Sequence, residues 1–205
     1  MVFTSSNSEG FLGNIENVYF RKNLTNFRAG TAIPLLRDHI WIVVRGMVKL
    51  SCLNEQGENV LLAINGPNET FGEPLTYFDL YEAKSLSDCD LHCLSMKEVQ
   101  LTPHLTLQLM QAMINRTRQA EALMMILSLR GIENRVQGFL ELLAQDYGQL
   151  CNEGLKLNFR LTHQEIASAV SSTRVSITKA LAQLKEEGWL QFDVQQKIIV
   201  NHLSR

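Results

Sequence analysis

Residues 161–190, with the sequence LTHQEIASAVSSTRVSITKALAQLKEEGWL, restrict the possible folds more than any other part of the chain. Thr162 followed by Glu165 forms a capping box, in which each side chain satisfies a backbone N–H at the start of a helix. Apolar side chains then recur at helical spacing, stop at the Ser171–Ser172 pair, and resume along the following residues. This pattern predicts two short helices joined by a tight turn.

Three further features complete the prediction for this segment. Ala167 is a small residue at the point where two helices would have to cross closely. Serine is a good N-cap, so we expect the second helix to begin near Ser172. After Gly188, two short apolar runs flank a turn at Gln195–Gln196, as two wing strands would. A helix-turn-helix with such a wing is a winged helix-turn-helix.

The second helix presents side chains that suit the major groove of DNA. Arg174 lies in its first turn, where a guanidinium can bond both O6 and N7 of a guanine. Val175 favours a thymine methyl group, and Lys179, one turn further, suits a base or a phosphate. Hydroxyls suited to phosphate contacts come from Thr162, Ser172, Thr173, Ser176 and Thr178. The segment therefore predicts sequence-specific binding to double-stranded DNA.

The charge distribution supports this prediction. Residues 156–205 carry seven Lys and Arg against four Asp and Glu, a net charge of +3. Residues 1–155 carry twelve against seventeen, a net charge of −5. A polyanion is expected to bind at the basic end of the chain.

The part of the chain from about Val18 to Leu94 is typical of short antiparallel strands separated by turn residues. Its clearest piece is a hairpin at Asn54 to Glu58, where Gly57 can adopt the positive φ of a tight turn. These features predict an N-terminal domain built mainly of β-strands.

A helical pattern of about 25 residues follows Pro103, with no Gly or Pro before Gly131. Such a helix can bury its apolar stripe against a twin helix, which predicts a homodimer; the alternative is a helix packed wholly on its own β domain. We expect Gly131 to act as a hinge before a second helix from Glu133 to Gln149. The stripe comprises Leu105, Leu109, Ala112, Met113, Ala120, Leu123 and Leu127.

Composition and motifs exclude several classes of protein. The chain shows no nucleophile–base pair, metal-ligand spacing or phosphate-binding loop, so we expect neither an enzyme nor a metal site. It shows no export signal and no apolar run long enough for a membrane, so we expect a cytoplasmic location. Four scattered cysteines are expected to be reduced thiols: Cys52, Cys89, Cys93 and Cys151.

With GENVLLAINGPNETFGEP in the β-rich part, the chain resembles the CRP/FNR superfamily of transcription regulators from about Phe27 to Val200. STRVSITK and MMILSLRGIENRVQGFLELLAQDYG resemble the cyanobacterial global nitrogen regulators within it. The resemblance implies an α+β fold: a cyclic-nucleotide-binding-like β-roll (jelly roll) in residues 1–102, a dimerisation helix in 103–130 and a winged helix-turn-helix in 131–205.

The nitrogen-regulator branch implies a dimeric activator that recognises a palindrome with GTA and TAC arms, with RNA polymerase as an expected partner. Arg174 and Val175 match the motif of that branch, and Lys179 replaces its usual arginine.

The resemblance also locates an effector pocket, with Gly72, Glu73, Arg116 and Arg118 as candidate residues. Relatives that bind cyclic AMP hold its phosphate with a Gly-Glu pair and a basic residue. Here Asp79, Leu80 and Tyr81 fall where the basic residue is expected. A cyclic phosphate would face Glu73 and Asp79 without a cation, so we do not expect cyclic AMP to bind.

Other effectors find equally little support in the sequence. The arginine that would hold 2-oxoglutarate is absent, although Lys84, Arg116 and Arg118 lie close by in sequence. No cysteine precedes residue 52, as an N-terminal iron–sulfur cluster would need, and a haem ligand at His39 or His92 has no corroboration. We therefore expect no cofactor and a regulator without a small-molecule effector. A 2-oxoglutarate-responsive regulator and a protein-docking adaptor that does not bind DNA remain as alternatives.

Overall fold

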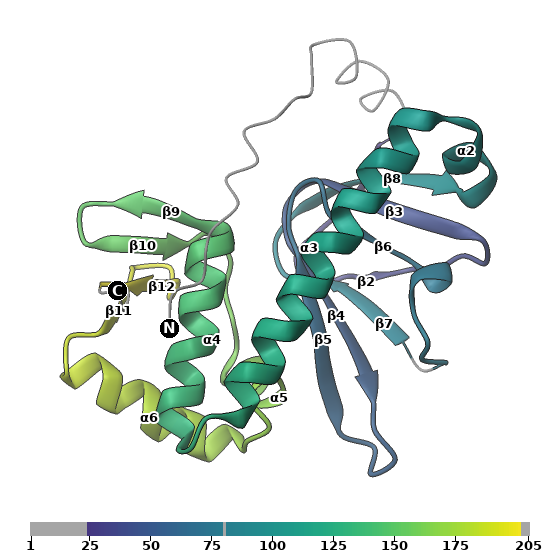
Figure 1. Ribbon diagram of the computed structural model, residues 1–205. Coiled ribbons are helices and arrows are strands. Elements are labelled where there is room, and N and C mark those ends of the chain that lie inside the picture. The colour runs from purple at the N-terminus through teal and green to yellow at the C-terminus, as the bar shows by residue number, and fades with distance from the viewer. Residues whose placement is uncertain (1–23, 80, 202–205) are drawn as a thin grey trace. The chain divides into compact units, whose positions relative to one another are not determined.

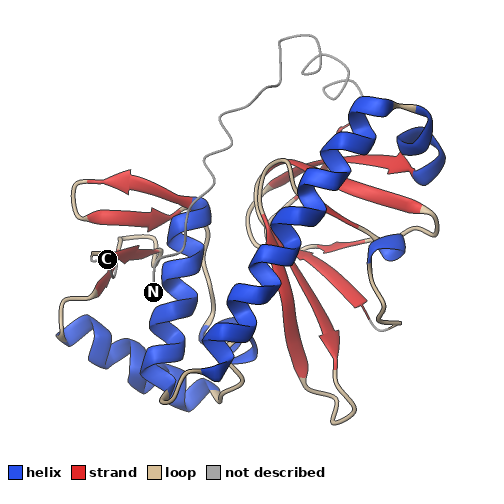
Figure 2. Cartoon of the chain, in the orientation of Figure 1, coloured by secondary structure: helices blue, strands red, loops and turns tan. Residues whose placement is uncertain are grey.

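In the computed structural model, which describes residues 24–79 and 81–201, the chain forms two compact units. The boundary between the units lies within one long helix, between Ala120 and Glu121 (Figure 1). Strands dominate the first unit, and the second combines helices with a small sheet (Figure 2). The predicted α+β class is confirmed. The first residues of the predicted β-rich part, from Val18, lie outside the described residues.

The first unit contains two four-stranded antiparallel sheets, with strand orders β1-β8-β3-β6 and β2-β7-β4-β5. Side chains from both sheets meet in one core, including Val43 and Leu91 from the first sheet and Leu50 and Ala83 from the second. This arrangement confirms the predicted β-roll. Its strands are β1 (Leu24–Phe27), β2 (Ala32–Ile33), β3 (His39–Arg45), β4 (Val48–Leu53), β5 (Asn59–Asn65), β6 (Thr70–Phe71), β7 (Tyr81–Ser85) and β8 (Cys89–Ser95).

The predicted hairpin joins β4 to β5. Gly57 has a φ of 75°, and its N–H donates to the Asn54 carbonyl at 2.9 Å. The Asn54 side-chain oxygen also accepts from the backbone N–H groups of Gln56 and Glu58. The turn is therefore held by one asparagine and one glycine that are close in sequence, which explains why the sequence predicts it.

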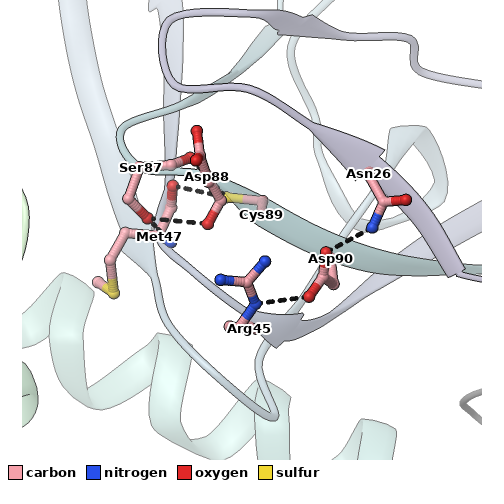
Figure 3. Close-up of polar contacts among 7 residues, drawn as sticks. All are labelled: Asn26, Arg45, Met47, Ser87, Asp88, Cys89 and Asp90. Atoms are coloured by element: carbon pink, nitrogen blue, oxygen red, sulfur yellow. Dashed lines mark hydrogen bonds and ion pairs between the residues drawn. The ribbon is translucent and has the colours of Figure 1, made fainter.

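A polar network closes one corner of the roll (Figure 3). Arg45 Nε lies 2.5 Å from an Asp90 carboxylate oxygen, and Asn26 donates to the other oxygen at 2.5 Å. The hydrogen bond from Arg45 holds the pKa of the Asp90 carboxyl below its usual range. Gly46 is required beside them, because a Cβ at that position would overlap the Asp88 carbonyl oxygen. The network joins β1, β3 and β8.

The four cysteines are free thiols in the structure. Cys52 and Cys89 are buried, and Cys89 donates to the Met47 carbonyl at 3.2 Å. Burial raises the pKa of the Cys89 thiol. Cys93 and Cys151 are half-buried.

Helix α2 (Met96–Leu101) leads into α3 (Pro103–Ser128), whose 26 residues confirm the predicted long helix. Leu105 is buried in a cluster with Ile40, Leu94 and Val99, so this part of the predicted stripe faces the roll. Ala112 is also buried within the chain. The prediction that Leu105 and Ala112 face a twin helix is therefore wrong, because both side chains are already buried within their own chain.

A buried amide fastens α3 to the roll. The Gln119 side-chain oxygen accepts from the Ile64 N–H, and the Gln119 NH₂ group donates to the Ile64 carbonyl, both at 3.0 Å. Gln119 is only 7% exposed. The side chain thus pairs with β5 as a neighbouring strand would, and it fixes where α3 lies on this unit.

The second unit contains three further helices and a four-stranded sheet of order β11-β12-β10-β9. Gly131 has a φ of 88° and caps the first of these helices, so the predicted interruption after α3 is present. Its role as a hinge stays a prediction. The elements are α4 (Ile132–Tyr147), β9 (Gly148–Cys151), β10 (Gly154–Leu157), α5 (His163–Ala169), α6 (Arg174–Glu186), β11 (Leu190–Phe192) and β12 (Ile198–Val200).

The end of α4 differs from the prediction. The helix stops at Tyr147, and Gln149 instead pairs with Lys156 in the β9–β10 hairpin. Gly148 is the reason, since any side chain there would overlap the Ala144 carbonyl oxygen. The apolar pattern of α4 runs up to this glycine, and the hairpin that follows was not predicted from the sequence.

Candidate nucleic-acid interface

The predicted capping box begins α5. Thr162 Oγ1 accepts from the Glu165 N–H at 3.2 Å, and a Glu165 carboxylate oxygen accepts from the Thr162 N–H at 2.8 Å. Ile166 and Ala167 of this helix are fully buried. The capping box thus orients a helix whose inner side is anchored in the core of the unit.

The turn after α5 closes through backbone contacts. Ser171 adopts a φ of 49°, and the Ser172 N–H donates to the Ala167 carbonyl at 3.0 Å. The N-cap of α6 is therefore Thr173, whose side chain accepts from the Ser176 N–H. Helix α6 thus begins at Arg174, near the predicted Ser172, but its N-cap is Thr173 rather than a serine, because the Ser172 N–H closes the turn.

Helix α6 has two contrasting sides. Ile177, Ala180, Leu181 and Leu184 are buried against the unit. The opposite side exposes the predicted base-contacting residues, namely Arg174, Val175 and Lys179. Val175 is 66% exposed, so its apolar side chain is available to a partner. The outer side of α6 therefore offers a cation and an apolar group next to each other.

Most of the predicted hydroxyls already have partners within the chain. Thr173 Oγ1 lies 3.0 Å from Ser176 Oγ, and Thr178 Oγ1 donates to the Arg174 carbonyl at 2.9 Å. Thr162 belongs to the capping box, and Ser172 is half-buried at the turn. These contacts position the hydroxyls along one surface.

One residue of this surface was not predicted from the sequence. His163, the first residue of α5, places its Nδ1 atom 2.8 Å from Thr178 Oγ1 on α6. The two residues are separated by 15 positions. Its place directly after the capping threonine was visible in the sequence, but its partner on the second helix was not.

The wing has the predicted form. Strands β11 and β12 pair in antiparallel register, and Gln196 has the positive φ of a tight turn, 60°. Asp193 accepts from the N–H groups of Gln195 and Lys197 at 2.8 Å each. A hydrogen bond from Lys156, together with these amides, lowers the pKa of Asp193 to about 2.

The candidate effector residues belong to the first unit, and only some of them come together. Gly72 is buried beside β3, where a Cβ would lie 2.5 Å from the His39 carbonyl oxygen. Glu73 begins a short 3-10 helix, η1 (Glu73–Leu75), and is exposed. One of its carboxylate oxygens accepts a hydrogen bond from the Asp38 N–H at 3.3 Å. Arg118 is exposed on α3. A glycine is therefore needed at position 72 for the close approach of the backbone to β3.

Tyr81 and Arg116 meet inside the first unit. Burial raises the pKa of Tyr81 to about 12, although the Arg116 guanidinium and the Gly72 backbone nearby oppose that shift. Within residues 24–79 and 81–201, neither the Tyr81 hydroxyl nor Arg116 Nη1 has a hydrogen-bond partner of good geometry. Lys84 lies on the outward face of β7, so it does not join this pair. Leu80 lies outside the described residues.

Two negative findings apply to residues 24–79 and 81–201. No helix there is long and apolar enough to cross a membrane. Nor do three or more His, Cys, Asp or Glu side chains gather there in a group suited to a metal ion.

Comparison with known proteins agrees with the fold. Residues 18–101 match the cyclic nucleotide-binding domain, and residues 134–205 match the Crp-like helix-turn-helix domain. The chain is 29% identical to the global nitrogen regulator of Nostoc sp., covering 89% of this chain and 83% of that protein. It is 30% identical to the global nitrogen regulator of Synechococcus elongatus, covering 82% and 79%.

A solved structure is also similar. The fold matches a transcriptional regulator of the CRP/FNR family from Thermus thermophilus with a TM-score of 0.70 and 26% sequence identity. The match covers 88% of this chain and 94% of that one.

Proposed function

The chain belongs to the CRP/FNR family of transcription regulators, and we propose that it activates transcription as a homodimer bound to a pseudo-palindromic DNA site with GTA- and TAC-like arms. The observation that carries the proposal is the first turn of α6, where Arg174 and Val175 are exposed on a helix anchored by Ile177 and Leu181. In this proposal, residues 103–130 dimerise, residues 131–205 bind DNA, and RNA polymerase is the partner in activation.

Each predicted base-contacting side chain of α6 has a chemical role in the proposal. The Arg174 guanidinium bonds O6 and N7 of a guanine, and Val175 contacts a thymine methyl group. Lys179 contacts a base or a phosphate. The hydroxyls of Thr162, Ser172, Thr173 and Ser176 contact phosphates and set the register, whereas the Thr178 hydroxyl, which donates to the Arg174 carbonyl, supports this surface from within the chain.

The proposed dimer rests on the outer face of α3. Leu107, Met110 and Ile114 are 61%, 55% and 39% exposed, and they recur at intervals of three and four residues, as in a coiled-coil seam. They lie opposite the buried Leu105 and Ala112 on the helix. Two such helices pack their apolar faces together and hold two α6 helices about one DNA turn apart, roughly 34 Å.

Sedimentation of Met110→Glu tests the dimer. A charge in the seam is expected to give a monomer and weaken DNA binding, whereas Met110→Leu, the matched control, stays dimeric. A Met110→Glu protein that sediments as the wild type would contradict the proposed dimer face.

We propose that DNA binding needs no small-molecule effector. The Tyr81 ring is part of the roll's core, and a Cβ at Gly72 would overlap the backbone of His39 on β3, so both residues have a structural role without a ligand. Lys84 lies on the outward face of β7, so it does not supply a cation for a phosphate beside Tyr81.

A second candidate is a regulator that responds to 2-oxoglutarate. Arg116 Nη1 is buried, and no described residue supplies it with a hydrogen-bond acceptor of good geometry. A carboxylate of a dianion is the kind of acceptor that an arginine favours.

The deciding experiment measures the affinity of the purified chain for a GTA/TAC palindrome and for scrambled DNA at fixed salt. Selective binding without additives is expected. Selective binding only with 2-oxoglutarate would favour the second candidate, and binding only with cyclic AMP would contradict the expected exclusion of that ligand. A promoter transcription assay with RNA polymerase then tests activation.

The same assay separates a DNA regulator from an adaptor. Arg174→Ala is expected to lose about 1–3 kcal/mol of binding free energy and to relax selectivity at one base pair of each arm. Lys185→Ala, which removes an exposed cation from the last turn of α6, is the control and is expected to keep selectivity. No effect of Arg174→Ala would favour an adaptor.

A further inference from the structure

His163 lies in a chain of hydrogen bonds that joins the two helices of the candidate interface. Its Nδ1 atom is 2.8 Å from Thr178 Oγ1, and Thr178 Oγ1 is 2.9 Å from the Arg174 carbonyl oxygen. His163 is half-buried, whereas Thr178 and Arg174 are exposed. The imidazole therefore sits at the edge of the surface that displays Arg174 and Lys179.

The donors in this chain determine which imidazole nitrogen carries the proton. A hydroxyl has one hydrogen, and a carbonyl oxygen has none to give. When Thr178 donates to the Arg174 carbonyl, the hydroxyl can only accept from His163, so Nδ1 carries a hydrogen. In the neutral ring, Nε2 is then a bare acceptor.

Nε2 makes no hydrogen bond to any residue in the described part of the chain. As an acceptor, it is unsuited to a phosphate oxygen, which is an acceptor as well. A second proton changes both properties, because Nε2 becomes a donor and the ring gains a full positive charge. As long as Thr178 donates to the Arg174 carbonyl and Nδ1 is therefore a donor, only the imidazolium form can also donate from Nε2 to the DNA backbone.

We propose that His163 contacts a DNA phosphate through Nε2 and takes up a proton when it does so. Thr178 acts as the positioning residue that holds Nδ1 as a donor. This inference rests on the proposed function and adds a proton-linked backbone contact to the same interface. DNA affinity then rises as the pH falls through the range in which histidines titrate, about pH 5 to 8.

The charged groups around His163 are consistent with this role. Helix α5 packs against α6, where Arg174 and Lys179 lie within about one turn of Thr178. On α5, the helix of His163 itself, the Glu165 carboxylate accepts hydrogen bonds from the N–H and the hydroxyl of Thr162. A phosphate is thus the anion that would compensate the positive charges of the His163 imidazolium, Arg174 and Lys179.

The test measures the affinity of the full chain for the palindrome at about pH 6 and about pH 8, with a salt titration at each pH. The wild type is expected to bind at least about fivefold more tightly per protomer at the lower pH. Its salt dependence should steepen there by about one phosphate contact per protomer.

Three variants identify the group responsible. His163→Gln is expected to abolish the change with pH in both the affinity and its salt dependence. His163→Arg is expected to retain tight binding at the higher pH. Thr178→Val frees Nδ1 to accept, so the neutral ring can carry its proton on Nε2, and the pH dependence should flatten. His104→Gln, which changes an exposed histidine on α3, is the matched control and should behave as the wild type.

The outcomes separate this inference from the proposed function. Selective binding with the same pH and salt dependence in His163→Gln as in the wild type would overturn the phosphate contact. Equal weakening at both pH values would also overturn it, since that result indicates a purely structural histidine. No selective binding by the wild type at either pH would overturn the proposed function, and this inference with it.

Discussion

The winged unit and the roll use their polar side chains in opposite ways. On α5 and α6, Thr162 and Thr173 satisfy backbone groups three positions away and stay at the surface. In the roll, Gln119 is buried against Ile64, 55 positions away, and the Tyr81 hydroxyl is buried beside Arg116. The two helix caps therefore display polar groups through local contacts, whereas Gln119 and Tyr81 are enclosed through contacts with distant segments.

This difference has a consequence for mutation. A surface held by helix caps tolerates changes in the side chains that it displays, so base-contacting residues can vary without loss of the fold. Buried polar groups depend on every neighbour, so a change there alters stability before it alters ligand binding. Substitutions at Phe71, Tyr81 and Thr173 test this contrast and are taken in order of decreasing effect.

Phe71→Ala should destabilise the roll most. Phe71 is fully buried between the two sheets, and its truncation is expected to cost about 3–5 kcal/mol in the free energy of unfolding. Phe78→Ala is the matched control, because Phe78 is 48% exposed and its loss should cost less than about 1 kcal/mol. Urea unfolding of both variants gives the comparison, and equal losses would contradict the placement of this core.

Tyr81 should make the stability of the roll depend on alkaline pH. Because the pKa of Tyr81 is raised from 10.0 to about 12, the stabilisation is complete below pH 10 and is lost as the pH rises towards 12. The wild type should lose about 2–3 kcal/mol more than Tyr81→Phe over that range.

Unfolding at several alkaline pH values measures this difference. Tyr77→Phe serves as the control, since Tyr77 is 95% exposed and its side chain is not enclosed by the roll. Parallel pH profiles for the wild type and Tyr81→Phe would show that the hydroxyl is not enclosed as described.

Thr173→Ala should have the smallest effect, in the winged unit. Loss of the cap that accepts from Ser176 N–H is expected to cost about 1 kcal/mol of stability. Thr173→Ser keeps the oxygen and should stay near the wild type in thermal unfolding. A loss of stability as large as that of Phe71→Ala would contradict the contrast between the two units, because it would show that α6 depends on its cap rather than on its buried side.

Local signals predicted much of the molecule. The capping box at Thr162, the glycine turn at Gly57 and the length of α3 are confirmed, since each depends on residues within a few positions or on an uninterrupted periodic pattern. The same holds for the exposure of Arg174 and Val175, which follows from the apolar stripe on the other side of α6. Their contacts with DNA stay a prediction.

Other features depended on contacts between distant segments. Ser172 fits an N-cap in isolation, but its N–H closes the turn on Ala167, and Thr173 takes that place. The stripe on α3 fits a twin helix equally well, yet Leu105 is covered by the roll, and a different face stays open.

Residue order alone was enough to specify the main helices and the polar side of α6, because helix periodicity and capping act over one or two turns. It was not enough to specify which face of α3 is buried, or that His163 meets Thr178. Those contacts form between segments whose separation in space is set by the packing of each unit, and that separation cannot be read from their distance along the chain.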